Sequence, residues 1–215
     1  MGILPAALTK LLEPHPDVTV LAREADEAVL VALLKAREID LFVARLAPIA
    51  ADPELALRPL FEDSICVLAS RAHPLAARKR VSWDDIANER WVVPPSSALS
   101  FDHVQRTLHK GGLTMPRHVV QSMAASVALG MVLQGNFLCF GTYLFHEFSG
   151  LKPLLTILKI ELPKVQVAFG AVTLEGRDLN PLGLRLAALV TELADAARNG
   201  YGSGTVHATG AAKRR

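Results

Sequence analysis

The apolar residues at the start of the chain recur first with a helical and then with a strand-like period. Residues 3–13 place apolar side chains on one helical face, and Pro14 ends this helix. Residues 18–24, VTVLARE, alternate as a half-buried strand does. A helix over 28–37 and a short apolar strand over 39–46 follow. This alternation predicts an α/β fold with parallel strands joined by crossover helices.

The next apolar segments are a long extended stretch and a short capped helix. Residues 55–70 are extended over a length that is typical of a strand crossing between two lobes. Residues 81–87 predict a short helix in which Ser82 is the cap and Asp85 completes a weak capping box. Residues 91–95 form a strand that stops at a double proline.

The centre of the chain repeats the pattern of helix and strand. Phe101, Val104 and Leu108 mark one helical face, Gly111 ends that helix, and a strand covers 116–122.

The last third of the chain begins with an apolar helix that Ser122 opens and Gly135 ends, followed by a buried strand over 136–142. Two apolar stretches within 152–175 predict strands that return to the first lobe, and Asn180 caps the closing helix.

Together these elements predict two Rossmann-like α/β lobes joined by two crossover strands. The first lobe is assigned to residues 1–62 plus 163–199, the second to residues 63–162, and residues 200–215 are expected to be a disordered tail. The first lobe is expected to lack its first strand, because the chain opens directly into a helix. Hinged two-lobe folds of this kind bind a ligand between the lobes.

Composition and charge narrow the class of protein. Of the 215 residues, 51% are hydrophobic and 20% are charged, which is typical of a folded soluble domain. A net charge of +2 gives no electrostatic footprint for nucleic acid or a membrane. Cys66 and Cys139 lie in apolar runs, as unpaired thiols do in a reducing compartment. With neither a spanning segment nor a secretion signal, a cytoplasmic location is expected.

The sequence carries no catalytic or metal-binding motif. It has no nucleophile elbow, no Walker loop and no dinucleotide fingerprint, and its seven histidines form no ligand pair at helical spacing. We therefore expect neither an enzyme nor a metal or other cofactor.

Small polar residues instead precede two helices, at the carboxyl ends of predicted strands. Ser96, Ser97 and Ser100 precede one helix and Ser122 another, so they either cap these helices or help the free N–H groups to bind an anion. Arg45 follows an apolar strand and is either a surface residue or a partner for a carboxylate or phosphate.

Several segments, taken in order, resemble the effector-binding domain of LysR-type transcription regulators. They are GILPAALTKLLEPHPDVTV, LLKAREIDLFVARL, RPLFEDSICVLASRAHPLA, WDDIANERWVVPP, GGLTMPRHVV and QSMAASVALGMVLQG, and they cover about residues 2–198. The run VARL is similar to the V-G-R-L of the subgroup that includes the galactose-binding-protein regulator and regulators of aromatic-acid degradation, with Ala44 in place of glycine.

The resemblance implies a type 2 periplasmic-binding-protein fold with an effector between the lobes. It implies that the effector is small and is anionic or hydroxylated. The implied contact residues are Arg45, Pro95, Ser96, Ser97, Ala98, Ser122, Met123, Gly141 and Thr142.

The resemblance also implies partners. Sensor domains of this family pair as dimers or tetramers, with Leu8, Leu11 and Val20 as the interface positions here. DNA would be bound only through a helix-turn-helix domain that these residues do not include. The alternative is a solute-binding protein of a transport system, which shares the architecture.

Overall fold

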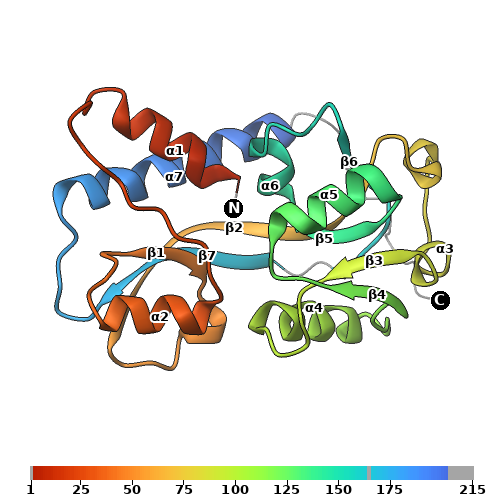
Figure 1. Cartoon of the computed structure of the whole chain (residues 1–215), viewed down its shortest axis with the longest axis horizontal. Helices are drawn as coiled ribbons and strands as arrows, with labels where there is room; N and C mark the ends of the chain where they lie inside the picture. Colours follow the sequence, from red (N-terminus) through yellow and green to blue (C-terminus); the bar gives the residue numbers. More distant parts are fainter. Residues whose placement is uncertain (1, 164–165, 203–215) are drawn as a thin grey trace, which may run out of the picture.

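One long strand, β2 (Leu55–Ser70), runs through both halves of the molecule (Figure 1). The structure is a computed structural model that describes residues 2–163 and 166–202. Leu55–Ser64 of β2 pair with β7 (Gln166–Leu174), whereas the remainder pairs with β5 (Leu138–Thr142) and β6 (Leu155–Ile157). The predicted crossing strand is confirmed, and it passes from one sheet to the other after Ser64.

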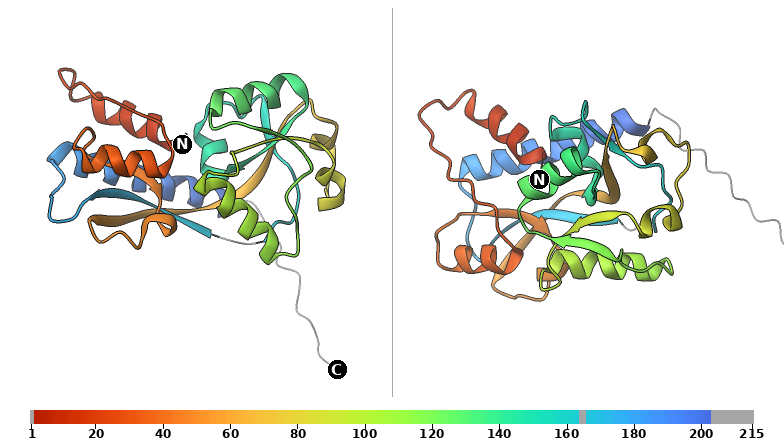
Figure 2. Two further views of the ribbon diagram at one scale, coloured as in Figure 1. Left: turned by 60° about the horizontal axis from the view of Figure 1, so that its bottom comes forward. Right: turned by 45° about the vertical axis from the view of Figure 1, so that its right-hand side comes forward.

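The first lobe is a short antiparallel sheet covered by helices on both faces. Its strand order is β1 (Phe42–Arg45), β7, β2, and each neighbouring pair is antiparallel. The helices α1 (Ile3–Leu12) and α7 (Pro181–Gly202) pack together on one face (Figure 2), and α2 (Glu27–Lys35) covers the other.

Val43 of β1 packs against the cluster that α1 and α7 build, whereas Phe42 and Ala44 pack against α2. The parallel arrangement predicted for this lobe is wrong for the described strands, because β7 lies between β1 and β2 and runs against both.

The strand predicted over residues 18–24 is also wrong. This segment returns from α1 towards α2 without regular secondary structure. The segment alternates in sequence, but its neighbouring residues Val20 and Leu21 are both exposed, and no described strand pairs with this segment. A strand forms only where a neighbour completes its hydrogen bonds, and the alternating pattern cannot report that neighbour.

The second lobe is a mixed sheet with a parallel centre. The strands β3 (Arg90–Val93) and β4 (His118–Gln121) are parallel, and so are β3 and β5. Trp91 is fully buried at the centre of this sheet, and its indole N–H donates to the carbonyl of Ile86 at 2.8 Å. The helices of this lobe are α3 (Trp83–Ala87), α4 (Leu99–Lys110), α5 (Ala125–Gly135) and α6 (Tyr143–Phe148).

Four further features differ from the sequence prediction. The helix expected to open at Ser122 begins at Ala125, and the unpredicted α6 follows β5 directly. Of the two strands expected to return to the first lobe, β6 stays in the second and only β7 returns. The tail was placed from residue 200, yet α7 extends to Gly202, and residues 203–215 lie outside the described residues.

Two 3-10 turns, Ala47–Ile49 and Pro74–Ala77, complete the regular structure. Among the described helices, none has both the length and the apolarity needed to cross a membrane.

Candidate functional site

Three of the predicted contact segments follow the carboxyl ends of neighbouring parallel strands. Residues 95–98 follow β3, residues 122–123 follow β4, and Gly141 and Thr142 end β5. The Ser122 N–H donates to the Val93 carbonyl at 3.0 Å, which holds the first two segments together. The predicted common edge is therefore present in the second lobe, at the position where open α/β sheets bind ligands.

The loop after β3 presents polar side chains at the start of α4. Ser96 and Ser97 are exposed, Pro95 is half-buried, and Ala98 is buried and occupies the N-cap position of α4 without a side-chain hydrogen bond. The first N–H groups of α4 are thus not capped by a side chain at that position, which leaves them suited to an anion or a hydroxyl.

Ser122 and Met123 differ in their surroundings. The Ser122 hydroxyl accepts from the Ala124 N–H at 3.1 Å, a local turn contact, and Met123 is exposed. Ser122 therefore acts as a turn residue ahead of α5 in this structure.

Gly141 and Thr142 are both engaged within the protein. A Cβ at Gly141 would lie 2.4 Å from a methyl carbon of Leu68, so close packing explains this glycine. The Thr142 hydroxyl accepts from the Phe145 N–H at 3.3 Å and caps α6.

Asp63 of β2, which the sequence analysis did not single out, completes this end of the sheet. Its carboxylate accepts from the Leu144 N–H at 3.2 Å and from the Ser64 N–H at 2.8 Å. Burial raises the pKa of Asp63, and the Thr142 hydroxyl and three backbone N–H groups partly oppose that rise. A carboxylate of the crossover strand is thus bound at the start of α6.

Arg45 lies in the first lobe and is bound to Glu27. Its Nε donates to Glu27 Oε1 at 3.0 Å and its Nη2 contacts the same oxygen. The two side chains are only 14% and 10% exposed. Two of the five N–H donors of the guanidinium are directed at this carboxylate, so Arg45 presents a pair that is neutral overall rather than an isolated cation.

His103 of α4, in the second lobe, is influenced by the charges of this pair. Its buried Nε2 has no hydrogen-bond partner among the described residues. Burial lowers the pKa of His103, and the positive charges of Arg45, Arg106 and Lys110 lower it further, with Glu27 opposing. His103 therefore lies within electrostatic reach of the Glu27–Arg45 pair, and α2 and α4 lie on the same side of the two lobes (Figure 1).

Neither Glu27 nor His103 was recognised from the sequence. Glu27 reads there as an ordinary first-turn acid, and His103 as a lone surface histidine. In the described part of the chain, the acidic, histidine and cysteine side chains form no group that could hold a metal ion.

A model of the LysR substrate binding domain matches residues 1–198. The chain belongs to this family. It is 26% identical over 193 residues to the HTH-type transcriptional regulator GalR of Pseudomonas putida, covering 89% of the chain and 48% of GalR. It is 27% identical over 183 residues to the transcriptional dual regulator GltC of Bacillus subtilis, covering 83% of the chain and 59% of GltC. The chain thus spans about half to three-fifths of these relatives.

Solved structures of LysR effector domains share the fold. The effector binding domain of a BenM variant has a TM-score of 0.67 at 20% identity, with 93% of this chain and 90% of that chain covered. The effector binding domain of QuiR in complex with shikimate has a TM-score of 0.66 at 15% identity, with 90% of each chain covered. The two-lobe, periplasmic-binding-protein-like fold implied by the sequence is confirmed.

Proposed function

We propose that this LysR substrate-binding domain senses a small anionic or hydroxylated metabolite between its lobes, as part of a cytoplasmic transcription regulator. The observation that carries the proposal is the common carboxyl edge of β3, β4 and β5, which gathers Ser97, Ser122 and Thr142. The relatives GalR and GltC are transcriptional regulators, which favours regulation over catalysis and over transport.

The chemistry of this edge supports an oxygen-rich ligand. The start of α4 offers backbone N–H groups beside two exposed serine hydroxyls, and His103 offers a buried ring nitrogen that has no hydrogen-bond partner in the described part of the chain. Shikimate, with which the effector binding domain of QuiR is in complex, is both a carboxylate and a polyol and so belongs to the class that we propose.

In this proposal the two lobes, residues 1–62 with 163–199 and residues 63–162, close on the effector. Arg45 acts as part of its ion pair with Glu27. The ligand would therefore form a hydrogen bond with a pair that is neutral overall, and would not neutralise an isolated positive charge. Closure would be passed on to a helix-turn-helix unit of the whole regulator, and domains would pair around Leu8 and Val20. Leu11 is buried and would pack beneath that surface.

The experiment is a thermal-shift and calorimetric titration with a panel of shikimate, benzoate, galactose and phosphate. We expect at least one compound to bind, and Ser97→Ala and His103→Ala to weaken its binding about tenfold, which corresponds to about 1.4 kcal/mol. Arg185→Ala, which removes an exposed arginine of α7, is the control and should leave the affinity unchanged.

Arg45 is tested as a pair with Glu27, because removing one buried partner leaves the other charge uncompensated. The double variant Glu27→Gln with Arg45→Met keeps the shape and removes both charges. Unchanged affinity in this variant and in Ser97→Ala and His103→Ala would place the ligand elsewhere.

A further inference from the structure

A histidine of the second lobe lies at the boundary with the first lobe. His103 belongs to α4, and its ring is influenced by the charges of Arg45, at the end of β1, and Glu27, at the start of α2. The helices α2 and α4 lie beside each other across this boundary (Figures 1 and 2). A movement that separates the two lobes would therefore change the surroundings of His103.

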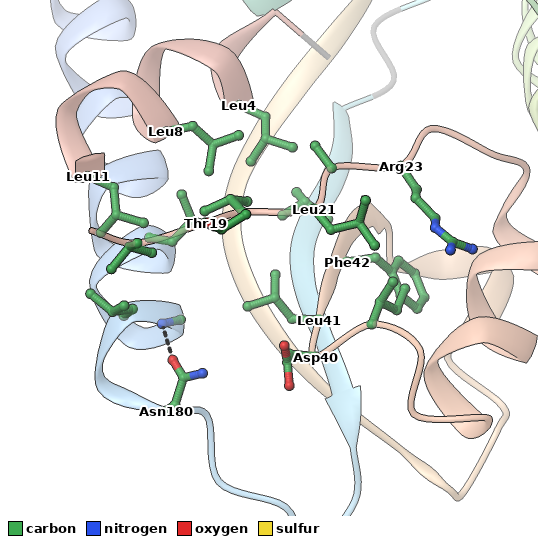
Figure 3. Close-up of a pocket in the computed structure, with 18 of the residues that line it drawn as sticks. Leu4, Leu8, Leu11, Thr19, Leu21, Arg23, Asp40, Leu41, Phe42 and Asn180 are labelled. Atoms are coloured by element: carbon green, nitrogen blue, oxygen red, sulfur yellow. Dashed lines mark hydrogen bonds between the residues drawn. The ribbon is translucent and has the colours of Figure 1, made fainter. Parts of the chain in front are cut away.

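This boundary is separate from the apolar pocket of the first lobe. The pocket has a volume of about 390 Å³ and is lined mainly by aliphatic side chains such as Leu4 and Leu8 (Figure 3). Phe42, the first residue of β1, lines the pocket, whereas Arg45, the last residue of that strand, does not. The ion pair that influences His103 thus lies at the opposite end of β1 from the pocket.

The hydrogen bonding of His103 favours its neutral form. Its Nε2 atom is buried and has no hydrogen-bond partner among the residues that the structure describes. In a neutral imidazole one ring nitrogen donates and the other accepts, whereas a protonated imidazole donates from both. Protonation would therefore place a charged N–H group where no described acceptor meets it. A buried charged donor without an acceptor costs free energy, and contact with water removes that cost.

The charges around the ring also oppose protonation. Arg106 and Lys110, further along α4, form no ion pair within the described part of the chain, and Arg45 adds a third positive charge. Glu27 has the opposite effect, but its carboxylate is bound by Arg45. If Glu27 turned towards His103 instead, the arginine would be left buried without its partner, which is costly.

These conditions link the protonation of His103 to the separation of the lobes. Burial lowers the pKa of His103 below its ordinary value of 6.5, and the three positive charges lower it further. Opening the lobes would hydrate the ring and move Arg45 away from it, which would bring the pKa closer to 6.5. The open state therefore binds the proton more tightly than the closed state. As the pH falls below 6.5, the population shifts towards the open state.

We propose that His103 is a proton-sensing residue whose protonation opens the two lobes and thereby lowers the affinity of the domain for its effector. The effect on affinity rests on the proposed function, whereas the opening is a property of the chain without an effector. The domain would respond to acidification and to a metabolite through the same movement of its lobes.

The first experiment measures the separation of the lobes in the full chain without an effector. Spin labels are attached at Val29→Cys in α2 and Gln105→Cys in α4, two exposed positions on either side of the boundary, and the distance between them is measured by pulsed electron paramagnetic resonance. Cys66 and Cys139 are buried and the pKa of each thiol is raised, so neither should be labelled. From about pH 7.5 to about pH 5.5, which spans the ordinary pKa of histidine, the ratio of long to short distances should rise about fivefold or more.

Two matched variants of the labelled chain assign the response to one histidine. His103→Gln keeps a polar side chain that takes up no proton in this range, and His109→Gln removes an exposed histidine from the last turn of the same helix. We expect the His109 variant to respond as the parent does, and the His103 variant to show the same distances at both pH values. A parent that does not respond, a response that persists in His103→Gln, or lobes that move closer at the lower pH would overturn the proposal.

A titration with shikimate separates this proposal from the proposed function. Its carboxylate stays ionised over this pH range, so a change in affinity reports on the protein. If shikimate binds, its dissociation constant should rise about fivefold or more at the lower pH in the wild type and stay constant in His103→Gln. A wild-type dissociation constant that is the same at both pH values would overturn the proposal. If no compound of the panel binds at either pH, the proposed function fails, and the distance measurement alone then decides on His103.

Discussion

Asp63 shows how one buried side chain links the crossover strand to the second lobe. It is 6% exposed and accepts hydrogen bonds from backbone N–H groups at the start of α6, 81 positions away along the chain. Asp63→Asn replaces one acceptor oxygen by a donor that faces these N–H groups. We expect the free energy of unfolding to fall by about 1–3 kcal/mol, measured by urea denaturation near neutral pH.

The same residue makes a pH prediction. Burial raises the pKa of Asp63 above its ordinary value of 3.8, so the folded state holds this proton more tightly than the unfolded state. The stabilisation from the protonated form is complete below pH 3.8 and is lost as the pH rises through the folded pKa. The stability of the wild type relative to Asp63→Asn should therefore decrease as the pH rises from 3.8. A difference in stability between the wild type and Asp63→Asn that does not change with pH would contradict the prediction.

The sequence could indicate which residue types lie at strand ends but not which of them meet. The serines at residues 96, 97 and 122 were correctly placed at a common edge, because strand ends follow from apolar periodicity. The partners Glu27 and Arg45 lie 18 positions apart on different elements, and only the packing of α2 against β1 brings them together. Arg45 could therefore be selected as a candidate while its carboxylate partner was missed.

Among the elements, α3 tests how far local chemistry alone determines structure. Its predicted capping box is confirmed, with the Ser82 hydroxyl accepting from the Asp85 N–H at 3.2 Å and the Asp85 carboxylate accepting from the Ser82 N–H at 2.8 Å. Ser82→Ala should lower the free energy of unfolding by about 1 kcal/mol near neutral pH, measured by thermal denaturation.

The pH dependence of that effect follows from Asp85. Hydrogen bonds from Ser82, with Arg78 adding to them, lower the pKa of Asp85 below 3.8. The stability that this carboxylate contributes is present above pH 3.8 and is lost as the pH falls through its folded pKa. The cost of Ser82→Ala should therefore shrink below that pH. A cost of Ser82→Ala that stays the same below that pH would argue against the box.

The elements that sequence reasoning misplaced are those that depend on neighbours. Residues 18–24 have the strand pattern but no described partner strand, so the pattern alone does not produce a strand. The helix α6 was not predicted, although a threonine after a buried strand is an ordinary N-cap. Capping in α3 was predictable because both partners lie within four residues.

At the scale of the whole molecule, β2 takes part in both sheets. Because its residues pair in one sheet or the other, with a register irregularity between Pro59 and Phe61, we expect a destabilised first lobe to destabilise the second lobe as well. Cys66 and Cys139 can report this, since both are buried in the second lobe. Burial raises the pKa of the Cys66 thiol, and raises that of Cys139 to about 12. Both thiols should therefore react only after the protein opens.

The substitution Gly170→Ala in β7 can be used to destabilise the first lobe. A Cβ there would lie 2.5 Å from the Arg58 carbonyl oxygen, so Gly170→Ala forces two strand backbones apart. If β2 makes the lobes one cooperative unit, both thiols should react faster with a disulfide reagent, by about tenfold for each 1.4 kcal/mol lost. Gly130→Ala is the matched control, because a Cβ at Gly130 meets no atom within 4 Å and alanine favours a helix. Its thiols should react no faster than those of the wild type. A destabilised Gly170→Ala whose thiols keep the wild-type rate would mean that the lobes open independently, and closure around an effector would then have to be transmitted by contacts other than β2.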